Sequence, residues 1–174
     1  MNVVETLANR NRTFARTRFD RGLRMRPGLS TIVIGCLDPR VDPAVVLDAE
    51  HGEISVIRNI GGRVTRRTIE ELIMLQEVAR ANASDIGAGW EIVVMQHTQC
   101  GIKLIKDRAE LLTPYFEVAE EDLPGAAVDD PRAAVAHDVA ALRAEPRLGG
   151  VRVSGLVYDL LTGRVDTVVA PCAA

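Results

Sequence analysis

Two short clusters of polar residues, each directly after an apolar run, limit most strongly what this chain can fold into. Cys36, Asp38 and Arg40 form the first cluster, and His97 and Cys100 form the second. Together they supply two thiolates and one imidazole, enough for three ligands of a tetrahedral zinc ion. A carboxylate and a guanidinium lie beside the first thiolate. This combination indicates a reaction centre as well as a metal site.

The apolar runs before the two clusters predict buried strands. Residues 31–35 (TIVIG) precede the first cluster, and residues 91–96 (EIVVMQ) precede the second. Such β-branched runs are typical of a parallel sheet covered on both faces. Because ligands bind at the carboxyl ends of strands in open α/β sheets, we expect both clusters at that edge. A turn after the second strand can aim His97 and Cys100 at one point, and Gly101 permits the backbone bend.

The rest of the pattern predicts an α/β fold with a central, mostly parallel sheet, flanking helices, an antiparallel C-terminal strand and an N-terminal helical arm. A third strand is expected at residues 53–59. The next helix should begin near Thr65 or Thr68, where Thr68 and Glu71 fit a capping box. Its apolar residues recur at roughly helical spacing: Ile69, Leu72, Ile73 and Val78.

The C-terminal third predicts a helix and a hairpin. Asp130 and Pro131 suit the cap and first turn of a helix that Pro146 ends, and its inward side carries Val135, Val139 and Leu142. Residues 151–158 and 165–169 are expected to form a terminal hairpin. Residues 112–130 are rich in proline, glycine and acidic residues, and we expect a long loop with short helical pieces at most.

Length and composition predict one zinc-binding domain over residues 1–174. The 174 residues are 47% hydrophobic, and no repeat or long linker divides them. No apolar run is long enough for a membrane span, and the N-terminus lacks the apolar segment of a signal peptide. Three cysteines give no disulfide framework, and Cys172 is expected in a frayed tail. We therefore expect a cytoplasmic protein without membrane partners.

Positive charge is concentrated at the N-terminus although the net charge is only -3. Residues 1–26 contain seven arginines and two acidic residues. A basic arm of this kind can bind nucleic acid, but 3% aromatic residues and the lack of a recognition motif argue against that partner. We favour an amphipathic helical arm in which Val4, Leu7 and Phe14 contact a neighbouring subunit.

The residue types alone leave two other interpretations of the clusters open. Cys36 and Cys100 can be inert buried thiols, with His97 as a hydrogen-bonded histidine at a strand end. A closed structural zinc site that adds the Asp38 carboxylate would instead serve a non-catalytic binding module. The joint occurrence of all these residues with Arg40 favours an active centre.

Other polar residues receive structural interpretations. Asn59 is expected to stabilise the turn after the third strand, where Gly61 and Gly62 supply unusual dihedral angles. His51 and His137 titrate in the range that a proton shuttle needs, but a surface position is the simpler interpretation of each.

Three motifs in this order and spacing resemble the β-class carbonic anhydrases, in particular their short bacterial subgroup. They are Cys-x-Asp-x-Arg at residues 36–40, Arg-Asn-x-Gly-Gly at residues 58–62 and His-x-x-Cys-Gly at residues 97–101. The resemblance covers about residues 28–170. It implies a zinc lyase that interconverts carbon dioxide and bicarbonate through zinc-bound hydroxide. It also implies a homodimer or a dimer of dimers in which the N-terminal helix embraces the neighbour.

Carried over by position, the resemblance implies that Cys36, His97 and Cys100 hold Zn²⁺, while Asp38 and Arg40 form the adjoining catalytic dyad. It also implies a closed state in which Asp38 becomes the fourth ligand and Arg40 is released. Relatives on the same scaffold hydrolyse carbon disulfide or carbonyl sulfide, and this activity is the alternative within the enzyme class. We expect low activity below about neutral pH and a gain above it.

Two positions depart from the pattern of the family. Gln99 stands where the family often has aspartate, so we expect the following helix to be capped differently. Ile60 replaces a smaller residue of the family's turn. We expect its side chain to form one wall of the substrate pocket and to narrow access.

Overall fold

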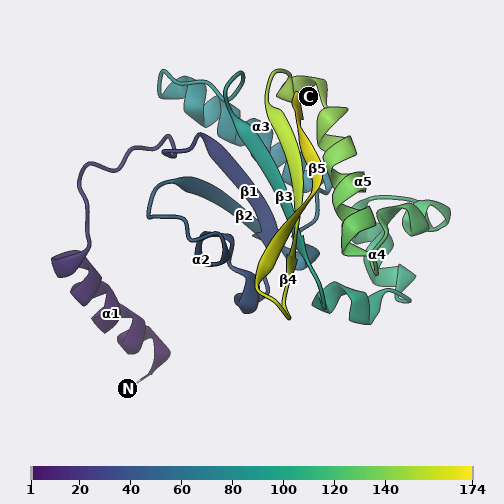
Figure 1. Ribbon diagram of the computed structural model, residues 1–174, viewed down its shortest axis with the longest axis horizontal. Coiled ribbons are helices and arrows are strands. Elements are labelled where there is room, and N and C mark those ends of the chain that lie inside the picture. The colour runs from purple at the N-terminus through teal and green to yellow at the C-terminus, as the bar shows by residue number, and fades with distance from the viewer. Residues whose placement is uncertain (1, 174) are drawn as a thin grey trace.

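The computed structural model describes residues 2–173, and these residues form a five-stranded sheet flanked by helices (Figure 1). The strands follow one another along the sheet in the order β2-β1-β3-β4-β5. Their bounds are β1 Thr31–Cys36, β2 Ile54–Asn59, β3 Glu91–His97, β4 Arg152–Asp159 and β5 Arg164–Ala173. The α-helices are α1 Val3–Thr17, α2 Pro43–Val46, α3 Arg66–Ala81, α4 Ala109–Phe116 and α5 Pro131–Arg143.

The pairing of the strands confirms the predicted sheet. β1 pairs in parallel with β2 and β3, and β3 pairs in parallel with β4. Only β5 runs antiparallel, in the predicted hairpin with β4. Because β1, β2 and β3 run in one direction, their carboxyl ends reach the same edge of the sheet. That edge carries Cys36, Asn59 and His97 as the last residues of the three strands.

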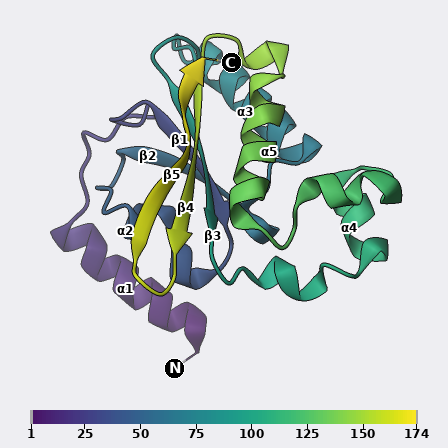
Figure 2. The ribbon, with the colours of Figure 1, turned by 45° about the vertical axis from the view of Figure 1, so that its right-hand side comes forward.

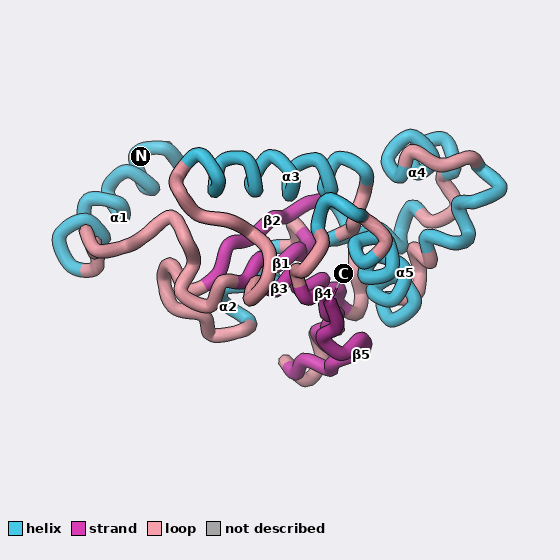
Figure 3. Tube along the Cα trace, turned by 90° about the horizontal axis from the view of Figure 1, so that it is seen from above, coloured by secondary structure: helices cyan, strands magenta, loops and turns pink. Residues whose placement is uncertain are grey.

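Helices α3 and α5 cover one face of the sheet, and α2 lies on the other (Figure 3). Side chains from β1, α3 and α5 meet in one core cluster that includes Ile34, Leu72 and Val139. β1 and β3 are mostly buried along their length, as expected for strands covered on both faces.

The start and the buried face of α3 differ in detail from the prediction. Thr65 is the N-cap residue, and it forms a capping box with Thr68. This box replaces the predicted one between Thr68 and Glu71. Val78, which was grouped with the apolar residues at helical spacing, is 47% exposed. Gln76 is buried instead, because its Nε2 donates to the Ile86 carbonyl at 2.9 Å. A satisfied amide can therefore replace an apolar side chain on this face.

The C-terminal third follows the prediction closely. The Asp130 side chain caps α5 by accepting from the backbone N–H of Arg132 at 2.9 Å, and Pro131 occupies the first turn. The predicted inward residues of α5, Val135, Val139 and Leu142, are buried. The predicted loop over 112–130 contains the end of α4 and a 3₁₀ segment, Glu120–Ala126. α4 begins at Ala109, before the range in which helical pieces were expected.

Helix α1 projects from one end of the molecule in Figure 1, and Figure 2 shows the segment that connects it to β1. Phe14, predicted to contact a neighbouring subunit, is partly buried and contacts His51 of the same chain, with ring centroids 5.8 Å apart. A capping box between Asn2 and Glu5 closes the N-terminus of α1, as a stable helix start requires. None of its residues is buried, and Val4 and Leu7 are 70% and 57% exposed. Among residues 2–173, no helix combines the length and the apolar character needed to cross a bilayer.

Candidate metal centre

Three potential metal ligands converge at the carboxyl edge of the sheet. Cys36 ends β1, His97 ends β3, and Cys100 lies in the turn that follows β3. One ligand atom from each residue lies within 4.8 Å of the other two, and the two sulfurs are 3.8 Å apart. Cys36 and His97 are buried and Cys100 is partly buried. The fold therefore brings together the three residues that the sequence singled out.

The geometry of this group fits a zinc ion. Two sulfurs that share a tetrahedral zinc through bonds of about 2.3 Å are separated by about 3.8 Å, as the two thiols are here. Nδ1 of His97 lies 2.9 Å from the Thr98 carbonyl oxygen and must therefore carry the proton. Nε2 of His97 is buried and has no hydrogen-bond partner among the described residues. Its lone pair is available to a cation, and the fixed tautomer is typical of metal-binding histidines.

The two thiols perturb each other's ionisation. A hydrogen bond from Cys100 lowers the pKa of Cys36 against the opposing effect of burial, and His97 and the Asp38 N–H act in the same direction. The same contact with Cys36, together with burial, raises the pKa of Cys100. Two thiolates this close repel each other unless a cation lies between them. A divalent ion would stabilise both charges at once.

Asp38 and Arg40 form an ion pair beside the first thiol. Arg40 donates from Nε to both Asp38 carboxylate oxygens, at 3.0 and 3.2 Å, and from Nη2 to Oδ2 at 2.6 Å. Hydrogen bonding from Arg40 lowers the pKa of Asp38 to about 2, so the carboxylate stays ionised at ordinary pH. In this arrangement the carboxylate is held by Arg40, and Asp38 lies outside the three-residue group.

An open hollow lies in front of Cys36 and the ion pair. Its other walls are largely aliphatic: Leu37, Ile60, Ile102 and Ile105. Ile60 lines this hollow, as the sequence predicted, and its side chain is 51% exposed. An apolar surface beside one carboxylate and two thiols suits a small substrate without charge.

Arg58 has a role that the sequence did not reveal. The sequence named it only as the first residue of the motif at 58–62, but its guanidinium donates to the Cys36 carbonyl at 2.8 Å and to the Asp38 carbonyl at 2.7 Å. It also pairs with Asp42 at 2.6 Å. These bonds fix the backbone that carries the first thiol and the carboxylate. The signal in the sequence was a single arginine at the end of an otherwise uncharged strand.

The turn Ile60–Gly62 has the predicted structure. Asn59 donates from Nδ2 to the Arg63 carbonyl at 2.8 Å and accepts from the Arg63 N–H at 2.7 Å. Gly61 and Gly62 have φ angles of 73° and 63°, in the region that favours glycine. A Cβ atom at Gly62 would lie 2.7 Å from the backbone nitrogen of Cys36. The turn therefore packs directly against the strand end that bears the first thiol.

The turn between His97 and Cys100 corrects one expectation. The backbone takes the left-handed conformation at Gln99, with φ of 56°, and not at Gly101, to which we had assigned the bend. The Gln99 side chain is exposed, so only its backbone is constrained. No side chain caps the 3₁₀ segment that follows, Gly101–Ile105, which is consistent with the expected change in capping.

Comparison with known proteins identifies the family. Residues 31–111, which include all three potential ligands, match the family described as carbonic anhydrase. A carbonic anhydrase of Pseudomonas aeruginosa is 30% identical over 87% of this chain and 79% of its own. The chain belongs to the β-class carbonic anhydrase family. β-Carbonic anhydrase 1 of Mycobacterium tuberculosis is 26% identical over 86% of this chain and 88% of its own.

The fold agrees with this assignment. A solved carbonic anhydrase from Glaciozyma antarctica superposes with a TM-score of 0.73 at 27% identity, covering 97% of this chain and all of that one. β-Class carbonic anhydrases are zinc lyases, also called carbonate dehydratases. The family's zinc matches the group of two thiols and one imidazole found in this β-carbonic anhydrase.

Three residues outside the metal group are now located in this β-carbonic anhydrase. His51 and His137 are exposed, in keeping with the simpler interpretation of each. Cys172 is exposed but does not lie in a frayed tail, because it pairs with Val153 in the β4–β5 ladder. The last strand extends further than the predicted residues 165–169, to Ala173.

Proposed function

We propose that this chain catalyses the reversible hydration of carbon dioxide to bicarbonate and a proton, with zinc held by Cys36, His97 and Cys100. The observation that carries the proposal is the convergence of two thiols 3.8 Å apart with a histidine nitrogen that is buried and unpaired among the described residues. Cys36 of this group lines the aliphatic hollow that contains the Asp38–Arg40 pair.

The residues around the metal have distinct roles in the proposed reaction. Zinc, when bound, supplies the Lewis acidity that makes water nucleophilic near neutral pH. Asp38 accepts a hydrogen bond from the nucleophilic water and orients its lone pair toward the carbon. Arg40 keeps Asp38 ionised and holds its orientation. The aliphatic walls receive carbon dioxide, which needs no charged partner.

Asp38 has a second proposed role, as the fourth zinc ligand in a closed and inactive state. Arg40 holds Asp38 through its side chain and through its backbone N–H at 3.0 Å, which supports the open arrangement. Closure requires the side-chain bonds to break. Because hydroxide competes better with the carboxylate as pH rises, we expect activity to be low below neutral pH and to increase above it. A rate that stays flat from mildly acid to alkaline pH would contradict this exchange.

Stopped-flow assays on zinc-loaded protein test the reaction. Rapid proton release on mixing with carbon dioxide supports the proposal. Sulfide release from carbon disulfide or carbonyl sulfide, without carbon dioxide hydration, would favour the alternative hydrolase. If protein that contains one zinc per chain reacted with none of the three substrates, a structural zinc protein would be favoured.

We further propose that the chain acts as one domain, with residues 1–26 as an arm that packs on a second copy in a homodimer or a dimer of dimers. The support is that α1 buries none of its own residues and exposes Val3, Val4 and Leu7. Sedimentation of the full chain measures the assembly state. The cytoplasmic location and the lack of nucleic-acid partners stay predictions, to be checked by fractionation and by binding assays.

A further inference from the structure

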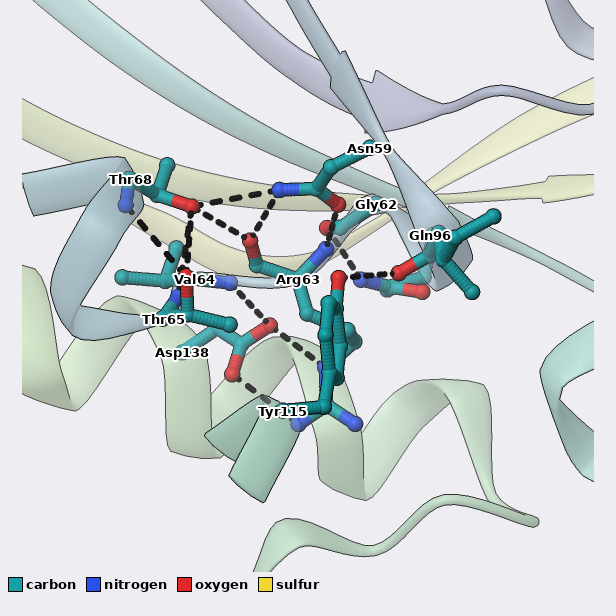
Figure 4. Close-up of polar contacts among 10 residues, drawn as sticks. Asn59, Gly62, Arg63, Val64, Thr65, Thr68, Gln96, Tyr115 and Asp138 are labelled. Carbon is teal, nitrogen blue, oxygen red and sulfur yellow. Dashed lines mark hydrogen bonds and ion pairs between the residues drawn. The ribbon is translucent and has the colours of Figure 1, made fainter. Parts of the chain in front are cut away.

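A buried ion pair links helix α5 to the turn beside the metal site. Arg63, directly after the turn Ile60–Gly62, donates from Nε to Oδ2 of Asp138 at 2.8 Å and from Nη2 to Oδ1 at 3.0 Å. Both side chains are 1% exposed. Asp138 also accepts from the Val64 N–H at 3.1 Å (Figure 4). Charges this deeply buried keep their partners, so the chain at Arg63 and Val64 is fixed relative to α5.

Two further contacts hold the same turn. Asn59 exchanges two hydrogen bonds with the backbone of Arg63. The Tyr115 hydroxyl donates to the Ile60 carbonyl at 2.6 Å (Figure 4). Burial raises the pKa of Tyr115 to about 12, so the hydroxyl keeps its proton. The turn is thus anchored from β2, α4 and α5.

The anchored turn touches the chain segments of all three potential ligands. Gly62 packs against the backbone of Cys36, where a Cβ would come within 2.7 Å of the nitrogen. Gln96, the neighbour of His97, donates from Nε2 to the Gly62 carbonyl at 2.6 Å. A Cβ at Gly61 would lie 2.9 Å from Cδ1 of Ile102, two residues after Cys100. A shift of the turn would therefore disturb all three segments.

Stability alone does not account for the ion pair. A buried pair often contributes no more than apolar residues of similar volume. Its placement against the metal-site turn suggests a role in geometry.

We propose that Asp138 is a positioning residue: through Arg63 and the turn Ile60–Gly62, it sets the separation of Cys36, His97 and Cys100 that zinc requires. This inference rests on the proposed zinc-binding role of those three residues. Asp138 itself contacts neither the metal group nor the hollow in front of it, so it acts at a distance.

The test compares Asp138→Asn with a matched control on the same helix. Asp138→Asn keeps the size of the side chain and removes its charge. We expect the zinc dissociation constant, measured by chelator competition, to rise about 10–100-fold. The visible absorption bands of the cobalt-substituted protein should also change, because they report the ligand geometry. Val139→Ala removes a buried side chain at the next position of α5 and should lower the Tm. The zinc dissociation constant and the cobalt spectrum should stay as in the unmodified protein.

A second variant covers the case in which Asp138→Asn does not fold. The double change Arg63→Met with Asp138→Leu replaces the pair by apolar side chains, which is often neutral for stability. We expect this double variant to fold and to bind zinc more weakly than the unmodified protein does. Either variant with unaltered zinc affinity and cobalt spectrum, and only the loss of Tm seen in Val139→Ala, would overturn the proposal.

The outcomes separate this inference from the proposed reaction. Zinc affinity and cobalt spectra can be measured whether or not the protein hydrates carbon dioxide. A contrast between Asp138→Asn and Val139→Ala in an inactive protein would support positioning and contradict the reaction. An active protein without that contrast would contradict positioning alone.

Discussion

The carboxyl edge of the sheet and the N-terminal arm differ in whether their side chains find partners within the chain. At the edge, Arg58 and Asn59 each make several hydrogen bonds within the chain, and Asp138 of α5 does the same for the adjoining turn. On α1, apolar side chains such as Val4 and Leu7 face solvent without a partner. Contacts within one chain therefore hold the edge, whereas a second chain is the proposed cover of the arm.

We expect the largest effect when one of the proposed zinc ligands at the carboxyl edge is removed. Cys100→Ala removes one of three proposed zinc ligands, and we expect loss of stoichiometric zinc and a fall of more than about 100-fold in carbon dioxide hydration. Metal analysis by mass spectrometry and stopped-flow kinetics measure the two quantities. Cys172→Ala, a change at an exposed thiol in β5, is the control and should alter neither. Full zinc content in Cys100→Ala would remove this residue from the site.

A slightly smaller effect should separate catalysis from metal binding. Asp38→Asn keeps the shape of the side chain but loses the charge that Arg40 stabilises, so we expect full zinc content and about 100-fold slower hydration. Asp130→Asn is a matched control, because asparagine caps a helix as well as aspartate and α5 should be unaffected. Unchanged turnover in Asp38→Asn would exclude this carboxylate from the mechanism.

The arm should respond in assembly and not in metal content. Leu7→Asp places a charge among the exposed apolar residues of α1, and we expect the dissociation constant of the dimer to rise about 10–100-fold, the equivalent of one buried leucine. Analytical ultracentrifugation measures it. Arg12→Asp puts the same aspartate on the other side of the helix as a control. If Leu7→Asp abolished zinc binding as well, the two regions would not be independent.

The smallest effect concerns the backbone at the edge. Gln99 adopts a left-handed conformation that asparagine tolerates better, so Gln99→Asn should raise the free energy of unfolding by about 0.5 kcal/mol. Gln99→Val should lower it, because β-branched residues are strained there. Urea unfolding of the zinc-loaded protein tests both. Equal stability of the two variants would show that this turn relaxes freely.

The sequence predicted the parts of the edge that depend on local pattern. The strands before Cys36 and His97, the turn at Gly61 and Gly62 and the cap at Asp130 are each specified by neighbouring residues, and the structure contains them. The convergence of the cysteines and the histidine also followed, because parallel strands bring their ends to one edge.

Long-range pairing could not be predicted in the same way. Arg63 and Asp138 are 75 residues apart, and no local spacing connects them. One signal was present: Asp138 interrupts the apolar side of α5 between Val135 and Val139, where an unpaired charge would be costly. Similarly, the assignment of the bend to Gly101 was wrong because composition shows which residue can take a left-handed φ and not which residue does.

The contact between the Ile60–Gly62 turn and β1 limits which mutations the gene can tolerate at Gly62. Every missense change in the codon for Gly62 adds at least one carbon atom where the backbone nitrogen of Cys36 leaves no space. Such alleles would push the first thiol away from its partners. Random mutagenesis with selection for growth that depends on bicarbonate should therefore recover almost no replacement at this position, although Gly62 does not line the hollow in front of Cys36.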